Sequence, residues 1–158
     1  MAPSPTAPRR GQFPDAPEDL LVSAEGEVFP RNDPGRSDLI DGSIGEGSPF
    51  QREFGYYAHG VDETTSILPA GWRDRLILVA GENTRFVRGW CLEIHDLAIA
   101  KYADGREKDL NFTKVLARHA MVTREILEQR LGVTPLESEQ RIRISQRIQK
   151  DFDDRSTA

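Results

Sequence analysis

Residues 75–112, RLILVAGENTRFVRGWCLEIHDLAIAKYADGREKDLNF, contain the change of pattern that decides the fold class. Residues 75–79 and 85–92 are rich in β-branched and aromatic residues, and the short stretch between them contains a glycine, so they predict a β-hairpin. Residues 94–103 then follow a helical spacing, and the pair Asp104 and Gly105 ends that helix. A hairpin that leads directly into a helix indicates an α+β protein.

The chain after this stretch predicts three more helices. Residues 107–120 place Leu110, Val115, Leu116 and His119 at a core-like spacing. Thr123 is a capping residue for a helix that Gly132 ends, and a fourth helix begins at Pro135 and runs to about residue 152. We therefore expect a small mixed or antiparallel sheet followed by a C-terminal helical bundle.

The first half of the chain gives weaker signals. Residues 20–30, LLVSAEGEVFP, predict a strand, residues 37–44 predict a short helix, and Ser48 caps another helix that ends at Gly55. Residues 55–72 predict irregular chain with at most one short strand. Residues 1–18 contain five of the ten prolines and no periodicity. We expect a disordered lead-in over 1–18, a folded domain over 19–134, and a C-terminal helix and tail over 135–158.

Composition limits where the protein works. No apolar run approaches the roughly 20 residues needed to cross a bilayer, and the N-terminal MAPSPTAPRRG does not look like a secretory signal. Cys91 is the only cysteine, which favours a reducing, cytoplasmic location, and its apolar surroundings predict a buried structural residue.

The net charge is −5, but residues 106–150 hold 10 basic and 6 acidic side chains, or +4. A solvated helix surface explains this excess as well as phosphate binding does, so we do not expect a nucleic-acid partner.

Two long stretches resemble a known family. Residues 39–76 contain the blocks GYYAHGV and LPAGWRDRL, residues 91–112 contain HDLAIAKYADGREKD, and residues 14–34 extend the likeness upstream. Together they resemble a bacterial family of uncharacterised nucleotidyltransferase-like proteins, related to the nucleotidyltransferases of abortive-infection toxins. The resemblance implies that residues 19–134 form a nucleotidyltransferase-like domain. It implies a nucleoside triphosphate as substrate, Mg²⁺ as cofactor, and transfer of a nucleoside monophosphate to a protein or nucleic-acid acceptor.

The resemblance also assigns the catalytic carboxylates to Glu25 and Glu27. Two residues at i and i+2 leave the same face of a strand, and such a pair can hold Mg²⁺. Relatives are expected to have aspartate where this chain has Glu27, and the added methylene changes the reach of that carboxylate. Two glutamates on a solvent-facing strand are the alternative interpretation.

A second expected feature is missing from the sequence. The family is expected to begin with a helix, a strand and a Gly-Ser phosphate-binding motif before Gln12, where this chain has MAPSPTAPRRG. The pair Gly42 and Ser43 follows the carboxylates, so it does not replace that motif. These features predict an N-terminally truncated, incomplete nucleotidyltransferase fold whose activity is open.

The resemblance places Lys101, Arg106 and Lys108 beside the nucleotide. A lysine supplies a point charge to phosphate and an arginine a bidentate fork. The alternative is structural, because Arg106 or Lys108 could pair with Asp104 or Asp109 and fix the corner between two helices.

The remaining signals favour packing over chemistry. Adjacent residues on a helix do not face each other, so His95 next to Asp96 predicts a packed or helix-start histidine and not a relay. Tyr56, Tyr57 and His59 could stack on a base, but we expect them to fill a core together with the tryptophans. The helices over 107–131 have a junction of helix-turn-helix length, yet the second carries two arginines against two glutamates.

Two functions therefore compete. The first is the metal-dependent nucleotidyltransferase. The second is a non-catalytic relic or interaction subunit that associates with a protein partner or with itself, as in a toxin–antitoxin type system.

Overall fold

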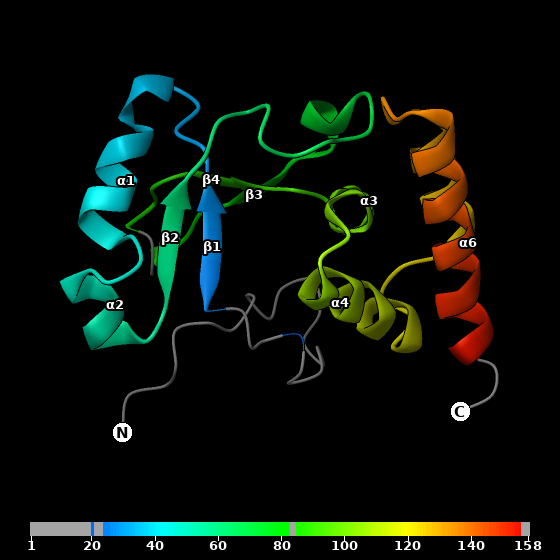
Figure 1. Cartoon of the computed structure of the whole chain (residues 1–158). Coiled ribbons are helices and arrows are strands. Elements are labelled where there is room, and N and C mark those ends of the chain that lie inside the picture. The colour runs from blue at the N-terminus through cyan, green and yellow to red at the C-terminus, as the bar shows by residue number, and fades with distance from the viewer. Residues whose placement is uncertain (1–19, 21–23, 83–84, 156–158) are drawn as a thin grey trace. The chain divides into compact units, whose positions relative to one another are not determined.

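The computed structural model describes residues 20, 24–82 and 85–155 of the 158-residue chain. The chain forms two compact units, Met1–Thr65 and Ser66–Ala158, and each is described here by itself (Figure 1). The lead-in predicted over residues 1–18 lies outside the described residues. The helices and short strands of the two units confirm the α+β class.

Unit 1 is built around two short parallel strands. Strand β1 (Glu25–Val28) pairs with β2 (Tyr57–Gly60), so that Glu25 lies opposite Tyr57 and Glu27 opposite His59. Parallel strands need a crossover connection, and helices α1 (Ser37–Ile44) and α2 (Pro49–Phe54) supply it. Helix α1 packs against β2, beside which it lies in Figure 1. This parallel pairing carries Glu25 and Glu27 next to residues that are about thirty positions away in the sequence.

Local chemistry explains the crossover. Ser48 caps α2 by accepting a hydrogen bond from the Gln51 amide, as predicted, and Gly55 ends the helix in the left-handed conformation at φ +78°. Gly60 is required for a different reason. A Cβ atom at Gly60 would lie 2.0 Å from the Ser37 carbonyl oxygen, so only glycine lets the start of α1 approach β2 so closely.

Unit 2 begins with a hairpin and continues as a helical bundle. After the 3₁₀ turn η3 (Trp72–Arg75), strands β3 (Ile77–Val79) and β4 (Gly89–Cys91) pair antiparallel, with Leu78 opposite Trp90. Helix α3 contacts each of the other three helices, and α6 also packs against α4 and α5. The four helices are α3 (Ile94–Asp104), α4 (Glu107–Arg118), α5 (Arg124–Gly132) and α6 (Ser138–Arg155).

The core of unit 2 lies between these helices. Its largest buried apolar side chains come one from each helix: Ile99, Leu116, Leu127 and Ile148. Ala98 and Ala100 on α3 are also buried, and their small side chains allow neighbouring helices to pack closely around α3. The predicted helical spacing after residue 94 is therefore confirmed as the source of the main core.

The hairpin is confirmed, but its strands are shorter than predicted. Arg85 and Phe86 adopt left-handed backbone conformations at φ +48° and +60°, so regular pairing begins only at Gly89. The expectation of a buried Cys91 and a core Trp90 is wrong. Cys91 is exposed and Trp90 is 47% exposed, because a two-stranded sheet of three-residue strands is too small to cover its own faces.

Two helix-level predictions also need correction. The last helix begins at Ser138 and not at Pro135, and Arg141 binds the backbone carbonyls of Leu131 and Thr134 in the preceding turn. His119 follows α4 and is exposed. The side chain of Glu93 caps α3 by accepting the amide of His95.

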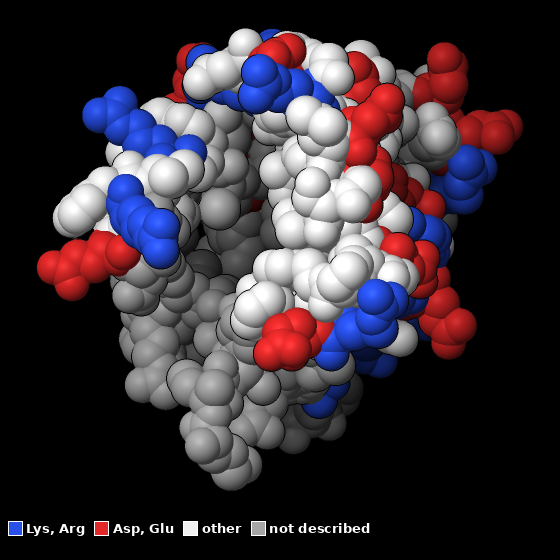
Figure 2. Space-filling view, turned by 90° about the vertical axis from the view of Figure 1, so that its left-hand side faces the viewer, with Lys and Arg blue, Asp and Glu red and all other residues white. Residues whose placement is uncertain are grey.

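No helix in the described part of the chain combines the length and apolar character required to cross a membrane. Figure 2 views the protein from the side of α1 and α2, and uncharged residues lie there between acidic and basic side chains. Leu39 on α1 is 60% exposed and Phe54 on α2 is 49% exposed. Helices α1 and α2 therefore each expose a large apolar side chain.

Candidate functional site

The two predicted catalytic carboxylates lie on β1. Glu25 and Glu27 are two residues apart on this strand, so both side chains leave the same face. The side chain of Glu25 is 25% exposed, whereas Glu27 is exposed. The partner strand places Tyr57 and His59 opposite these two residues, on the same face. Two carboxylates, a tyrosine and a histidine are thereby gathered on one side of the parallel pair.

A histidine between two carboxylates is the main feature that the sequence did not predict. The His59 Nδ1 atom lies 3.1 Å from Oδ1 of Asp41, and the His59 Nε2 atom lies 4.0 Å from Oε1 of Glu25. The same Asp41 oxygen accepts the backbone amide of Gly60 at 3.2 Å. The ring of Tyr57 meets the His59 ring edge-on, with centroids 5.2 Å apart and planes at 83°. The earlier expectation that His59 fills a core is wrong, because its side chain is 38% exposed.

The donor set on this face suits a hard cation. Mg²⁺ is typically held by one or two carboxylates together with phosphate oxygens and water. Glu25 and Glu27 offer that pair of carboxylates. Within the described residues, no group of three or more His, Cys, Asp or Glu side chains is placed to hold a metal ion by itself. A metal on this face would therefore take its other ligands from substrate or water.

The predicted nucleotide-binding residues lie in unit 2, at the corner between α3 and α4. Gly105 turns the chain there with φ +67°. Asp109 is buried, 3% exposed, and two cations surround it: the Lys101 Nζ atom lies 3.4 Å from its Oδ1 atom, and Arg106 donates to its Oδ2 atom. Arg106 also contacts Asp104 at 3.2 Å. Arg106 thus makes both of the pairings, with Asp104 and Asp109, on which the structural alternative depends.

This cluster holds a carboxylate ionised in the interior. Burial by itself would raise the pKa of Asp109, but the hydrogen bond from Arg106 and the charge of Lys101 outweigh it and lower that pKa below its usual value. The side chain of Arg106 is still 46% exposed and that of Lys101 is 22% exposed. Both cations therefore present part of their surface to solvent while they hold Asp109.

Lys108 lies in the first turn of α4 and is exposed. It belongs, with Lys101 and Arg106, to unit 2, whereas Glu25 and Glu27 belong to unit 1. Each group of predicted residues is therefore brought together within its own unit.

Other buried polar groups of unit 2 serve packing. Asp96 is fully buried and accepts two hydrogen bonds from Arg75, at 2.8 and 2.9 Å, while the Arg130 Nε atom lies 3.3 Å away. His95 contacts Glu93 through Nδ1 at 2.7 Å and accepts the Thr123 amide at Nε2. Because a backbone amide must donate, Nε2 carries no proton and His95 ties α3 to the start of α5. The prediction of a packed histidine is confirmed.

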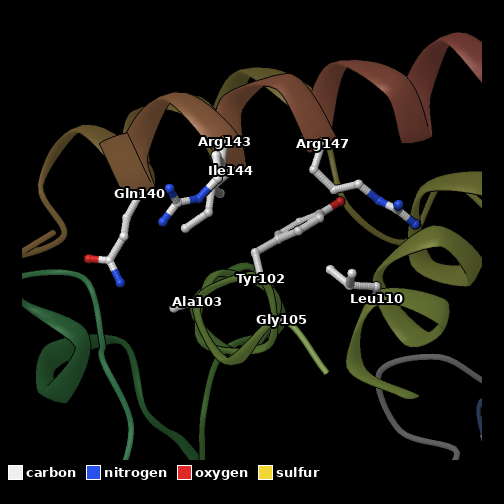
Figure 3. Close-up of a pocket in the computed structure, with 8 residues that line it drawn as sticks. All are labelled: Tyr102, Ala103, Gly105, Leu110, Gln140, Arg143, Ile144 and Arg147. Atoms are coloured by element: carbon white, nitrogen blue, oxygen red, sulfur yellow. The ribbon is translucent and has the colours of Figure 1, made fainter. Parts of the chain in front are cut away.

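A pocket of about 270 Å³ lies between α3, α4 and α6. Figure 3 shows Tyr102 reaching from α3 towards α6, with its hydroxyl on the side of Arg147. That hydroxyl donates to the buried Asp151 at 3.0 Å. Burial raises the pKa of Asp151, because it disfavours the charged form more than its partners stabilise it. Two arginines from α6, Arg143 and Arg147, line the pocket together with the apolar Leu110 and Ile144.

Comparison with known protein families identifies the family of the chain. A family model described as "Nucleotidyltransferase of unknown function (DUF6036)" matches residues 54–154, well over half of the chain. The chain belongs to this family. The match spans the α3–α4 corner with Lys101, Arg106 and Lys108, and it begins after the two glutamates of β1. No curated protein and no solved structure matches the chain.

The sequence of this nucleotidyltransferase-family protein predicts the glutamates and the cations as candidates, but it does not predict the contact between Asp41 and His59. These residues are 18 positions apart, and no spacing rule connects them. Only the crossover through α1 and α2 brings Asp41 next to the end of β2. A short alternation in YAHG was the one local signal for that strand, and its glycine and alanine weakened it.

Proposed function

We propose that this protein is a Mg²⁺-dependent nucleotidyltransferase that moves a nucleoside monophosphate onto a hydroxyl of a protein or nucleic-acid acceptor. The observation that carries the proposal is the placement of Glu25 and Glu27 on one face of β1. The family description supports the reaction class. A cytoplasmic location follows from the single cysteine, Cys91, and belongs to the same proposal.

In this proposal the chain contributes two kinds of group. Glu25 and Glu27 hold Mg²⁺, which when bound neutralises charge on the triphosphate. Lys101, Arg106 and Lys108 bind triphosphate oxygens, with lysine as a point charge and arginine as a fork. Asp109 keeps Lys101 and Arg106 extended and correctly spaced before the nucleotide arrives.

The transfer step is a displacement at phosphorus. The acceptor hydroxyl oxygen forms a bond to the α-phosphorus, and the bond from that phosphorus to the oxygen bridging to the β-phosphate breaks. Pyrophosphate leaves, and the hydroxyl proton passes to solvent. The enzyme lowers the barrier mainly by positioning and by stabilising charge on the phosphates.

The test is an isothermal titration of ATP, GTP, CTP and UTP, each with and without Mg²⁺. We expect saturable binding of at least one nucleotide. Lys101→Ala should weaken that binding with or without Mg²⁺, whereas Glu25→Gln with Glu27→Gln should remove only the Mg²⁺-dependent part. Glu53→Gln, an exposed change on α2, is the matched control. A well-folded protein that binds none of the four nucleotides overturns the proposal.

Transfer itself is tested with the preferred nucleotide labelled at the α-phosphate. Label should appear on an added protein or nucleic-acid fraction, with release of an equal amount of pyrophosphate. The double glutamate variant should abolish both signals. Pyrophosphate release that survives in the double variant would mean that other residues hold the metal.

A second candidate function is an interaction subunit, in the manner of a toxin–antitoxin component. Exposed apolar residues on and beside the β3–β4 hairpin favour it, since Phe86 and Val87 are 70% and 69% exposed and the cross-strand pair Leu78 and Trp90 is 47% exposed. This function predicts stable association with a protein partner or a second copy, and no response to nucleotides. Light scattering of Trp90→Ser beside the wild type tests self-association.

A further inference from the structure

The side chain of His59 is held from two directions. Asp41 lies 3.1 Å from Nδ1, and the same carboxylate oxygen is fixed by the Gly60 amide at 3.2 Å. Tyr57 packs edge-on against the ring. The carboxylate sets the rotation of the imidazole, and the tyrosine limits how far the ring can swing. Nε2 is therefore directed towards β1.

On β1 the histidine distinguishes between the two glutamates. The Nε2 atom lies 4.0 Å from Oε1 of Glu25, although Glu27 is the residue directly opposite His59 in the register. Glu25 is also the less exposed of the pair, whereas Glu27 is on the surface. One carboxylate of the candidate metal pair thus has a histidine nitrogen within ion-pair distance.

Orientation of this kind affects how tightly a metal is held. A glutamate has three rotatable side-chain bonds, and ordering them opposes metal binding. Residues that hydrogen-bond to metal ligands reduce this cost, and their loss typically weakens metal affinity by about 10- to 100-fold.

We propose that Asp41 and His59 are positioning residues that set Glu25 for divalent-metal binding. This inference rests on the proposed function, because it assumes that Glu25 and Glu27 hold the metal. It assigns the two glutamates different roles: Glu25 is oriented before the metal binds, and Glu27 takes up its coordinating position only when the metal binds.

The experiment measures Mn²⁺ binding by electron paramagnetic resonance, which counts the free ion and needs no turnover. His59→Asn retains a donor near the position of Nδ1 for Asp41 but cannot reach Glu25, so we expect about 10- to 100-fold weaker binding. His59→Gln places an amide nitrogen near the position of Nε2 and should recover part of that loss. Asp41→Asn should also weaken binding. Asp38→Asn, an exposed change on the same helix, is the control and should stay within about twofold of wild type.

Double-variant cycles separate positioning from a general structural effect. In the Glu25→Gln background, His59→Asn should weaken Mn²⁺ binding by less than about a further threefold, because the glutamate that His59 positions is already altered. In the Glu27→Gln background the full effect of His59→Asn should remain. An equal effect in both backgrounds, or His59→Asn binding that matches wild type, overturns the inference.

The outcomes also separate this inference from the proposed function. Wild-type protein that binds no Mn²⁺ overturns both. Wild-type binding that is lost in the two glutamate variants but unchanged in His59→Asn leaves the proposed function standing and overturns the inference alone. Circular dichroism of each variant, compared with wild type, identifies any variant that has lost secondary structure.

Discussion

The two units of the chain are stabilised in different ways. Unit 2 holds every fully buried large apolar side chain among the described residues, and in its helices buried carboxylates pair with arginines. In unit 1 the one described apolar residue that is buried is Ala58. Its long-range contacts include polar ones between α1 and the region of β2, such as Ser37 with the Val61 carbonyl at 3.1 Å and Asp41 with His59.

This difference bears on function. A region with few buried apolar contacts opens at lower free-energy cost than a packed helical core, and binding regions are commonly drawn from such regions. The candidate metal face lies in unit 1, where carboxylates remain accessible. The cations of unit 2 lie on a packed helix corner, where Asp109 holds them in place. The two units thus present their candidate residues differently: carboxylates on the strand surface in unit 1, and cations paired with a buried carboxylate in unit 2.

The largest expected effect is in unit 2. Asp96→Ala leaves Arg75 and Arg130 without the buried carboxylate that neutralises them, so we expect a loss of about 3–5 kcal/mol in the free energy of unfolding. Urea unfolding followed by circular dichroism measures it, and Asp153→Ala, exposed on α6, is the control. Amide hydrogen exchange should accelerate in α3 and α5 more than in β1 and β2. Equal acceleration in both units would contradict the comparison.

A moderate effect is expected in unit 1. Ser48→Ala removes the oxygen that accepts the Gln51 amide at the start of α2, which should cost about 1 kcal/mol. Amide hydrogen exchange should become faster in α2. Ser43→Ala, an exposed serine inside α1, lacks a capping role and should not destabilise the protein. If Ser43→Ala lowered the free energy of unfolding as much as Ser48→Ala, loss of the helix cap would not explain the effect of Ser48→Ala.

The smallest effect is a change in pH dependence. The pKa of Asp109 is lowered in the folded protein, so its ionised form stabilises the fold above the unfolded value of about 3.9. That contribution is lost as the pH falls through the folded-state pKa. Asp109→Asn should therefore be less stable than wild type near neutral pH, and the difference should shrink in acid. The urea concentration at half-unfolding, measured for both proteins from neutral to acid pH, gives this difference in stability. A difference that is constant with pH would exclude ionisation of Asp109 as the cause.

Much of the fold could be predicted because the signals are local. The helices over residues 94–132 follow from apolar spacing, Gly105 and Gly132 mark their ends, and Ser48 caps α2 as its sequence indicates. Strand lengths could not be predicted. Whether Arg85 and Phe86 pair or turn depends on a left-handed backbone that no residue type there demands.

The candidate site divides in the same way. The sequence by itself determined the i and i+2 spacing of Glu25 and Glu27, and it placed Lys101 and Arg106 on either side of a glycine turn, because these relations lie within a few bonds of chain. Only the tertiary structure decided that Asp109 would be buried between two cations and that Asp41 would hold His59 beside Glu25. Those contacts depend on helix packing and on the parallel crossover, and such long-range arrangements leave no periodic trace in the sequence.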